Sequence, residues 1–246
     1  MVPAFHEAAA IGSTVTRLRR GLAAAGIEGR VEVVVADDGS ADGTAEAAER
    51  AGADRVLRLP AHRGKGAAVR EGVLAAEGRT VVFTDADLAY PPEQIAALVL
   101  AVESGGDVVV GSRRHVDTVT LVRNRRLREV TGRAFNLLTR LILPVARRDT
   151  QCGLKAFSAS AAHQLFGASR LDGFAFDVEL FVLADALSLS VEEVPVELEN
   201  SDRSSVRLWP DALTMVRDLA RIRWWMATGA YRERLRGAGE AVQGGR

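Results

Sequence analysis

The feature that most constrains the fold is an alternation of short apolar runs with longer amphipathic ones over the first two thirds of the chain. The short runs are rich in valine and almost continuously apolar, which is typical of strands buried on both faces of a parallel sheet. They span residues 31–36, 55–59, 80–84 and 107–111. Helical patterns lie between and around them, at residues 8–25, 43–51, 67–76 and 92–104. This order predicts an α/β fold with a mostly parallel central sheet and helices on both faces.

The last third of the chain adds a longer amphipathic pattern and a smaller set of elements. The sequence predicts a helix at 123–143, a strand at 154–157, a helix at 176–187, a strand at 191–196 and a final helix from about residue 209. A chain of 246 residues suits one sizeable α/β core. We therefore expect one domain over 1–208, a C-terminal amphipathic helix over 209–236 and a disordered polar tail over 237–246. Residues 1–5 resemble the end of a buried strand, so we expect the chain to begin a few residues late.

Charge and cysteine content exclude several classes of protein. The 32 Lys and Arg balance the 32 Asp and Glu, so we expect no nucleic-acid partner. Residues 113–148 nevertheless hold ten Arg and only two acids, which favours contact with phosphates or an anionic membrane. The lone Cys152 excludes an internal disulfide and fits a reducing compartment, where we expect a buried structural thiol. No apolar run reaches 18 residues, so no transmembrane helix is predicted.

The residues that carry chemistry are expected directly after the strands, because open α/β sheets bind ligands beyond the carboxyl ends of their strands. Asp37 and Asp38 follow the strand at 31–36, and Asp85 and Asp87 follow the strand at 80–84. Two carboxylates in an Asp-x-Asp pattern can hold a divalent cation against a diphosphate. A lone Asp-x-Asp is also an ordinary turn or helix cap, so the interpretation depends on its conjunction with other motifs.

Five motifs occur in one order along the chain: V-P-A-F-H-E at 2–7, A-D-D-G-S at 36–40, R-G-K-G-A at 63–67, D-A-D-L at 85–88 and G-S-R at 111–113. Together they resemble GT-A glycosyltransferases of family 2, over most of the chain from residue 2 to about 207. Phe5 and His6 depart from the Tyr and Asn usual in that family. Two further motifs, at 149–155 and 176–180, are similar to the branch of dolichyl-phosphate glucosyltransferases and prokaryotic polyprenyl-phosphate relatives. The resemblance implies the GT-A fold.

The same resemblance implies a donor site. Pro3, Phe5 and Glu7 would line its nucleotide end, Asp38 would bond the base, and Lys65 would lie near the donor as a counter-charge. For Asp38 the alternative is an Asx turn into the next helix.

The metal and phosphate positions follow from the resemblance too. Asp85 would face the ribose and diphosphate, and Asp87 would coordinate Mg²⁺ or Mn²⁺. Arg113 would help to neutralise the leaving diphosphate. Arg203 and Arg207 would bind donor or acceptor phosphate, unless they lie in a solvated loop. The four His are scattered without ligand spacing, so no His metal site is expected.

The resulting hypothesis is an inverting transfer of glucose from UDP-glucose to a polyprenyl or dolichyl phosphate. An anionic phosphate needs little help from a general base, whereas a hydroxyl acceptor would require a carboxylate. Asp177 is favoured for that role over Glu179, which helical geometry turns elsewhere; either acid alternatively lies exposed on the helix. Open alternatives are a GDP-mannose-dependent mannosyltransferase, transfer to a glycan or small-molecule hydroxyl, and a catalytically silent nucleotide-binding scaffold.

The helices predicted at 123–143 and 209–235 indicate what the protein binds. Both combine an apolar stripe with arginines, and the second contains Trp224 and Trp225. Tryptophan at such a border is typical of interfacial helices. We expect a cytoplasmic protein, peripheral at the inner face of the membrane. The alternative is that these helices pack on the core or pair in a homodimer.

Overall fold

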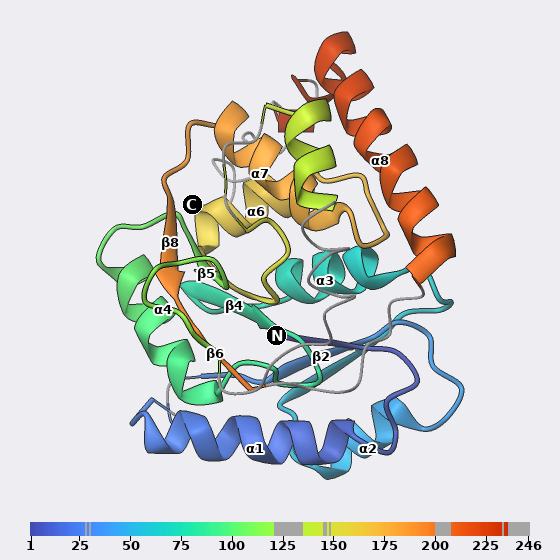
Figure 1. The fold of residues 1–246 in the computed structure, drawn as a ribbon. Coiled ribbons are helices and arrows are strands. Elements are labelled where there is room, and N and C mark those ends of the chain that lie inside the picture. The colour runs from blue at the N-terminus through green and yellow to red at the C-terminus, as the bar shows by residue number, and fades with distance from the viewer. Residues whose placement is uncertain are drawn as a thin grey trace.

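The computed structural model describes residues 1–27, 29, 31–120, 135–144, 147, 149–199, 208–232 and 234–235, with the backbone alone at 120 and 208–212. Its centre is one twisted sheet between two layers of helices (Figure 1). The predicted helix at 123–143 lies partly outside these residues, and the predicted tail at 237–246 lies wholly outside them. Within the predicted helix at 123–143, residues 135–142 are helical.

The sheet is built from two groups of strands that meet at the start of the chain. β1 (Val2–Ala4), β2 (Val34–Asp37) and β3 (Arg55–Arg58) pair in parallel in the order β1-β2-β3. β4 (Thr80–Thr84), β7 (Leu154–Ser158), β5 (Val108–Ser112) and β8 (Val191–Pro195) follow in the order β4-β7-β5-β8. The Met1 amine donates to the Val82 carbonyl at 2.7 Å, and the Thr84 N–H donates to the Met1 carbonyl at 3.1 Å. These bonds join β1 to β4.

One strand runs against the others, because β7 is antiparallel to both β4 and β5. β5 and β8 are parallel, as are β6 (Val119–Thr120) and β9 (Glu197–Leu198), which pair beyond the ends of β5 and β8. β4 and β5 therefore point the same way. The carboxyl ends of β1, β2, β4 and β5 consequently lie at one edge of the sheet, which is where the predicted site residues occur.

Alternation along the strands sends side chains into two separate cores. In β2, Val34 and Ala36 face one core, and Val35 faces the other. α3 (Lys65–Leu74), α6 (Ala159–Ala168) and α7 (Phe176–Ala186) cover the first face, and α1 (Ile11–Ala24), α2 (Thr44–Arg50) and α4 (Ile95–Glu103) cover the second (Figure 1). The prediction of a mostly parallel sheet covered on both faces is confirmed.

The C-terminal helix α8 (Leu208–Thr228) packs along the side of the domain. Its residues Leu219, Ile222 and Trp225 are buried in the same core as α3, α6 and α7. The apolar stripe of this amphipathic helix is thus used at least partly for packing on the domain. No helix in the described part of the chain is both long and apolar enough to cross a membrane.

Apart from one missed helix, local differences from the expected elements are small. β2 begins at Val34, and the predicted helix at 92–104 opens with a 3-10 turn, η2 (Pro92–Gln94), before α4. α6 was not predicted at all. It begins after Ser158, whose hydroxyl accepts a hydrogen bond from the Ala161 N–H at 3.2 Å, the usual arrangement at a helix N-terminus.

Candidate functional site

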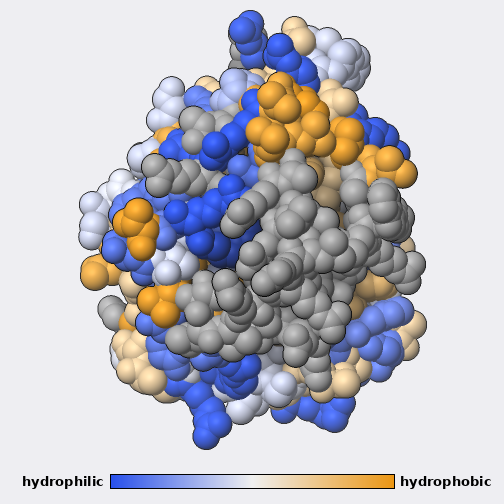
Figure 2. All heavy atoms as spheres, in the orientation of Figure 1, coloured by the Kyte–Doolittle hydropathy of each residue, from blue (hydrophilic) through white to orange (hydrophobic). Residues whose placement is uncertain are grey.

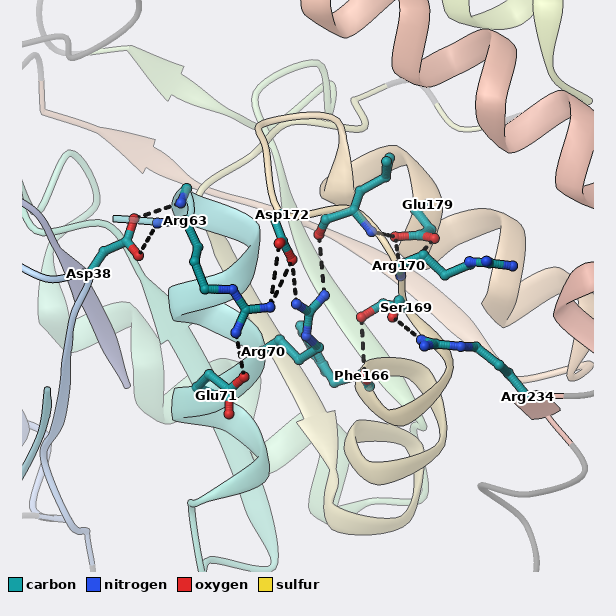
Figure 3. Close-up of polar contacts among 12 residues, drawn as sticks. Asp38, Arg63, Arg70, Glu71, Phe166, Ser169, Arg170, Asp172, Glu179 and Arg234 are labelled. Carbon is teal, nitrogen blue, oxygen red and sulfur yellow. Dashed lines mark hydrogen bonds and ion pairs between the residues drawn. The ribbon is translucent and has the colours of Figure 1, made fainter. Parts of the chain in front are cut away.

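Asp38, at the end of β2, holds the turn that precedes α3. Its carboxylate is buried and accepts hydrogen bonds from the N–H groups of Arg63 at 2.9 Å and Gly64 at 2.7 Å (Figure 3). His62 Nδ1 lies 2.7 Å from the same carboxylate. The alternative of an Asx turn into the next helix is wrong for Asp38, because its partners belong to a turn more than twenty residues further along the chain. Base recognition by Asp38 stays a prediction.

The turn places Lys65 against the end of β4. Lys65 Nζ lies 2.6 Å from the Asp85 carboxylate, and both side chains are partly exposed. Gly153 packs directly beside Asp85, since a Cβ at residue 153 would lie 2.1 Å from Asp85 Oδ2. The structure thereby brings together three of the predicted motifs, at 63–67, 85–88 and 149–155, around one carboxylate.

A second lysine and acid lie behind this pair. Lys155 Nζ donates to Asp177 Oδ1 at 2.7 Å, and both residues are buried. The ring of Phe83 links the two pairs, because Lys65 Nζ and Lys155 Nζ lie 5.4 and 5.5 Å from its centroid. At these distances a phenyl ring attracts a cation. The result is a compact cluster of alternating charges at the carboxyl end of β4.

The charges in this cluster shift one another's pKa values. Burial alone would lower the pKa of Lys65, but the charges of Asp85, Asp177 and Asp87 outweigh it and raise that pKa. Burial raises the pKa of the Asp177 carboxyl, although Lys155 and Lys65 act in the opposite direction. Lys65 therefore stays a cation at neutral pH, in a place where a diphosphate would need one.

Asp87 lies two residues beyond Asp85 in the turn after β4. Its Oδ1 accepts the Ala89 N–H at 3.1 Å. Within the part of the chain that the structure describes, no group of three His, Cys, Asp or Glu is placed to hold a metal. Two carboxylates at one strand end still match a hard cation that takes its other ligands from substrate phosphates and water, as Mg²⁺ commonly does.

The predicted nucleotide end lies at the carboxyl end of β1, beside the turn at 62–64 that precedes α3. Pro3 is buried in β1, and Glu7 is half-buried, with its N–H donating to Thr44 Oγ1 at 2.9 Å. Phe5 stacks on His6 with centroids 4.2 Å apart and on His62 at 3.8 Å. The stacking ring that the sequence predicts for a base is thus already in contact with two imidazoles.

Arg113 follows β5 and is bound to Asp149. Its Nε and Nη2 donate to the two carboxylate oxygens, both at 2.7 Å, and its backbone N–H donates to Oδ2 at 3.0 Å. Burial would raise the pKa of Asp149, but the hydrogen bonds and charge of Arg113 lower it to about 2. The guanidinium is held in a fixed, bidentate geometry while 40% of its side chain stays exposed.

The two acids at the start of α7 point in different directions, as predicted, but neither is exposed. Asp177 faces Lys155, whereas Glu179 is fully buried and accepts hydrogen bonds from the backbone of residues 170 and 171 and from Tyr231. The alternative of exposed helix acids is therefore wrong. Cys152 is also buried, as expected for a structural thiol, and burial raises its pKa.

Several residues of this site are not evident from the sequence alone. Lys155 interrupts an otherwise apolar strand, which is a signal that a buried acid must face it. Asp149, the partner of Arg113, lies within the motif at 149–155, and His62, the partner of Asp38, lies next to the motif at 63–67. Neither motif indicates which residue these side chains contact. Arg203 and Arg207 lie outside the described residues, so their phosphate-binding role stays a prediction.

Comparison with known proteins identifies the family. The model of "Glycosyl transferase family 2" matches residues 1–166. The chain is 38% identical to a dolichyl-phosphate beta-glucosyltransferase of Drosophila melanogaster over 213 residues, which are 82% of this chain and 65% of that protein. For a Saccharomyces cerevisiae protein of the same name the identity is 31% over 225 residues, 83% of this chain and 67% of that one. The chain therefore belongs to glycosyl transferase family 2.

Solved structures confirm the fold. Glucosyl-3-phosphoglycerate synthase from Mycobacterium tuberculosis, in complex with Mn²⁺, UDP-glucose and phosphoglyceric acid, superposes with a TM-score of 0.65. The sequence identity is 23%, and the match covers 93% of this chain and 78% of that chain. At this identity the likeness establishes the GT-A fold expected from the sequence, and the roles of individual residues stay predictions.

The contact of Gly153 with Asp85 makes a sharp prediction. Gly153→Ala forces the Asp85 carboxylate to move while leaving the fold intact, because only the end of a side chain must shift. We expect transferase activity to fall by about 100-fold and the melting temperature to change by no more than a few degrees. Gly29→Ala is the matched control, since no atom in the described part of the chain lies within 4 Å of a Cβ at that position. Unchanged activity of Gly153→Ala would contradict the placement of Asp85 in the site.

The Arg113 pair predicts a pH-dependent contribution to stability. Because the folded pKa of Asp149 is depressed from 3.8 to about 2, its ionised form stabilises the fold above about pH 4, and this contribution is lost as the pH falls toward 2. Asp149→Asn should therefore lower the free energy of unfolding by about 1 to 3 kcal/mol at pH 6. In urea unfolding, that difference should shrink below about pH 4. A difference that stays constant from pH 6 to pH 3 argues against the pair as its origin.

Proposed function

We propose that this chain is an inverting glycosyltransferase that moves glucose from UDP-glucose to a polyprenyl or dolichyl phosphate. The observation that carries the proposal is the contact between Lys65 and Asp85 at the carboxyl end of β4, in a turn that also presents Asp87. A donor diphosphate needs both cationic groups and carboxylates that can hold a metal at one place, and Lys65, Asp85 and Asp87 would meet that need here. The names and identities of the two dolichyl-phosphate beta-glucosyltransferases support the lipid phosphate acceptor.

The donor half of the proposal assigns roles to the residues around Asp85. Asp87, with Asp85 beside it, would hold a divalent Mg²⁺ or Mn²⁺ ion, whose positive charge stabilises the departing diphosphate. Lys65 and Arg113 would supply further positive charge to the same phosphates. Phe5, Pro3, Glu7 and Asp38 would form the nucleotide end, beside the turn at 62–64. The complex of the mycobacterial synthase with Mn²⁺ and UDP-glucose supports this choice of metal and donor.

The proposal of a phosphate acceptor is supported by the burial of Asp177 and by its contact with Lys155. Its side chain is only 7% exposed, and its Oδ1 accepts a hydrogen bond from Lys155. A carboxylate in this position is badly placed to take a proton from an incoming hydroxyl. A phosphate oxygen needs no such base, because it already carries negative charge. In one in-line step this oxygen bonds to the anomeric carbon as the bond to the diphosphate breaks, which inverts the configuration and releases UDP.

We also propose that the protein acts at a membrane surface, on its cytoplasmic side. Figure 2 shows an apolar patch in the upper part of the view, where Figure 1 has the helix at 135–142. In that helix Leu137 and Leu141 are 61% and 74% exposed, and in α8 Leu213 and Trp224 are 74% and 62% exposed. Exposed arginines accompany them on α8. Apolar anchors with nearby cations favour the surface of an anionic bilayer.

The surface proposal predicts salt-sensitive binding to vesicles. In flotation assays the protein should bind vesicles that contain anionic lipid and bind neutral vesicles less, with binding falling as salt rises. Trp224→Ala should reduce the bound fraction several-fold, since an interfacial indole is lost. Leu100→Ala is the matched control, because Leu100 is 66% exposed but lies on α4, on the opposite side of the sheet. Equal losses for the two variants would contradict a surface centred on α8.

The enzymatic proposal is tested with purified protein, Mg²⁺ or Mn²⁺, a polyprenyl phosphate and labelled UDP-glucose or GDP-mannose in parallel reactions. We expect a lipid-linked product from UDP-glucose, and a loss of at least about 1000-fold for Asp87→Asn. Asp185→Asn serves as the control, because Asp185 is exposed on α7. A product from GDP-mannose alone would show that the proposed donor, UDP-glucose, is wrong. The absence of a lipid-linked product with either nucleotide sugar would overturn the proposed polyprenyl phosphate acceptor.

The same assay separates the two kinds of acceptor. Asp177→Asn should keep activity within about tenfold of the wild type if the acceptor is a phosphate, because no proton has to be removed. For a hydroxyl acceptor the same change should abolish turnover. Thermal unfolding of the variant is measured alongside, since Lys155 loses its buried partner.

A further inference from the structure

Loop 169–173, between α6 and α7, connects the C-terminal helix to the donor turn. On one side it lies against α3, where the Asp172 carbonyl accepts the Ala67 N–H at 3.2 Å. The approach is close enough to require glycine at two positions. A Cβ at Gly64 would lie 2.5 Å from the Asp172 carbonyl oxygen, and a Cβ at Gly66 would lie 2.7 Å from that of Leu171. These glycines flank Lys65, so the position of the loop fixes the position of the lysine.

Charged side chains strengthen the same contact. The Asp172 carboxylate lies between Arg63 and Arg70 in Figure 3 and is paired with both. Arg70, on α3, also donates to the Leu171 carbonyl at 3.4 Å. The loop is therefore attached to both the turn and the first helical turns of α3, by backbone and side-chain contacts together.

On its other side the loop is held by Glu179. The Arg170 N–H donates to both oxygens of Glu179 at 3.0 Å, and the Leu171 N–H donates to Oε2 at 2.9 Å (Figure 3). The fourth bond comes from the C-terminal segment, where the Tyr231 hydroxyl donates to Oε1 at 2.8 Å. Glu179 is completely buried, so these donors are what keeps a carboxylate stable there.

The C-terminal segment makes two more contacts with the loop. The guanidinium of Arg170 lies 4.5 Å from the centroid of the Trp225 ring, and Arg234 donates to the Ser169 carbonyl at 2.9 Å. Trp225 and Tyr231 pack edge to face, with centroids 5.8 Å apart. The end of α8 and the residues after it thus form one side of a continuous set of contacts, and the donor turn forms the other.

We propose that Glu179 is a positioning residue for the donor site, which it couples to the C-terminal helix through Tyr231 on one side and loop 169–173 on the other. Displacement of α8, the helix that carries Trp224, would release the loop, loosen the turn at 62–68 and move Lys65 away from Asp85. Donor affinity accordingly depends on the position of a helix whose described contacts reach the donor turn through loop 169–173. This inference rests on the proposed donor site, but its structural part is independent of the reaction.

The experiment compares Glu179→Gln and Tyr231→Phe with Glu192→Gln, the same kind of change at an exposed position on β8. Hydrogen exchange is followed for peptides spanning residues 62–69, and binding of UDP-glucose with Mn²⁺ is titrated on the same proteins. We expect exchange at 62–69 to accelerate about tenfold in Glu179→Gln and less in Tyr231→Phe, while exchange in α1 and α2 stays unchanged. Tyr231→Phe keeps the buried charge and the ring, so it remains informative if Glu179→Gln unfolds.

The binding measurements distinguish positioning from general loss of stability. Donor affinity should fall about tenfold in Glu179→Gln, with no further fall when the change is added to Lys65→Ala, because both act through the same lysine. Additive losses, or unchanged exchange at 62–69, would overturn the proposal. If the wild type binds no UDP-glucose, the proposed donor is wrong, and the exchange data alone then decide whether Glu179 controls the turn.

Discussion

The arrangement of the site depends on the hydrogen bonds between the Asp38 carboxylate and the backbone of the turn before α3. A buried carboxylate is costly unless donors surround it, and backbone amides are donors that cannot rotate away. The amides of Arg63 and Gly64 meet that need. As a consequence the end of β2 determines where α3 begins, and with it where Lys65 lies relative to β4. Two strand ends that are separate in the sequence become one site through a single turn.

Next to this turn lie two ion pairs between a lysine and an aspartate. Lys155 and Asp177 form an ion pair inside the domain, and Lys65 with Asp85 forms another at its edge. An ion pair in the interior is often no more stabilising than apolar residues of the same size, because both ions lose their hydration. The benefit lies in electrostatics, since fixed charges in a partly dry site stabilise a developing anion without reorganisation. The cluster is therefore consistent with the proposed role in stabilising a leaving diphosphate.

The sequence was sufficient for most of the strands and for the position of Asp38, Asp85 and Asp87 directly after strands, because both depend on local patterns. Valine-rich runs predict buried strands, and an acid that follows such a run lies at the sheet edge whatever the rest of the chain does. Residues 31–33 were misassigned to a strand because apolar pattern alone does not show where pairing begins. α6 was missed because its run of small residues lacks strong helical periodicity, although Ser158 stands at its start.

What the sequence cannot supply is the choice of partner over long separations. Asp38 was expected either to bind a ligand or to cap the next helix, and in the structure its partners come from residues 62–64. The orientation of β7 also depends on distant partners. Its five residues contain no pattern that predicts a strand antiparallel to its neighbours. Helical geometry correctly predicts that the side chains of Glu179 and Asp177 point in different directions. Its function in holding loop 169–173 required knowing that Tyr231 returns to the same place.

A phosphate acceptor changes what such a site has to provide. When the nucleophile is already an anion, no proton has to be removed, so the remaining barrier is set by alignment of the reactants and by stabilisation of the leaving group. The close contacts of Gly64 and Gly66 with the backbone of loop 169–173 are consistent with that requirement, because a Cβ at either position would collide with a backbone carbonyl oxygen. The enclosed Asp177 is consistent with it as well. With the proposed phosphate acceptor, precise loop placement would take the role that a general base has in transfer to hydroxyl groups.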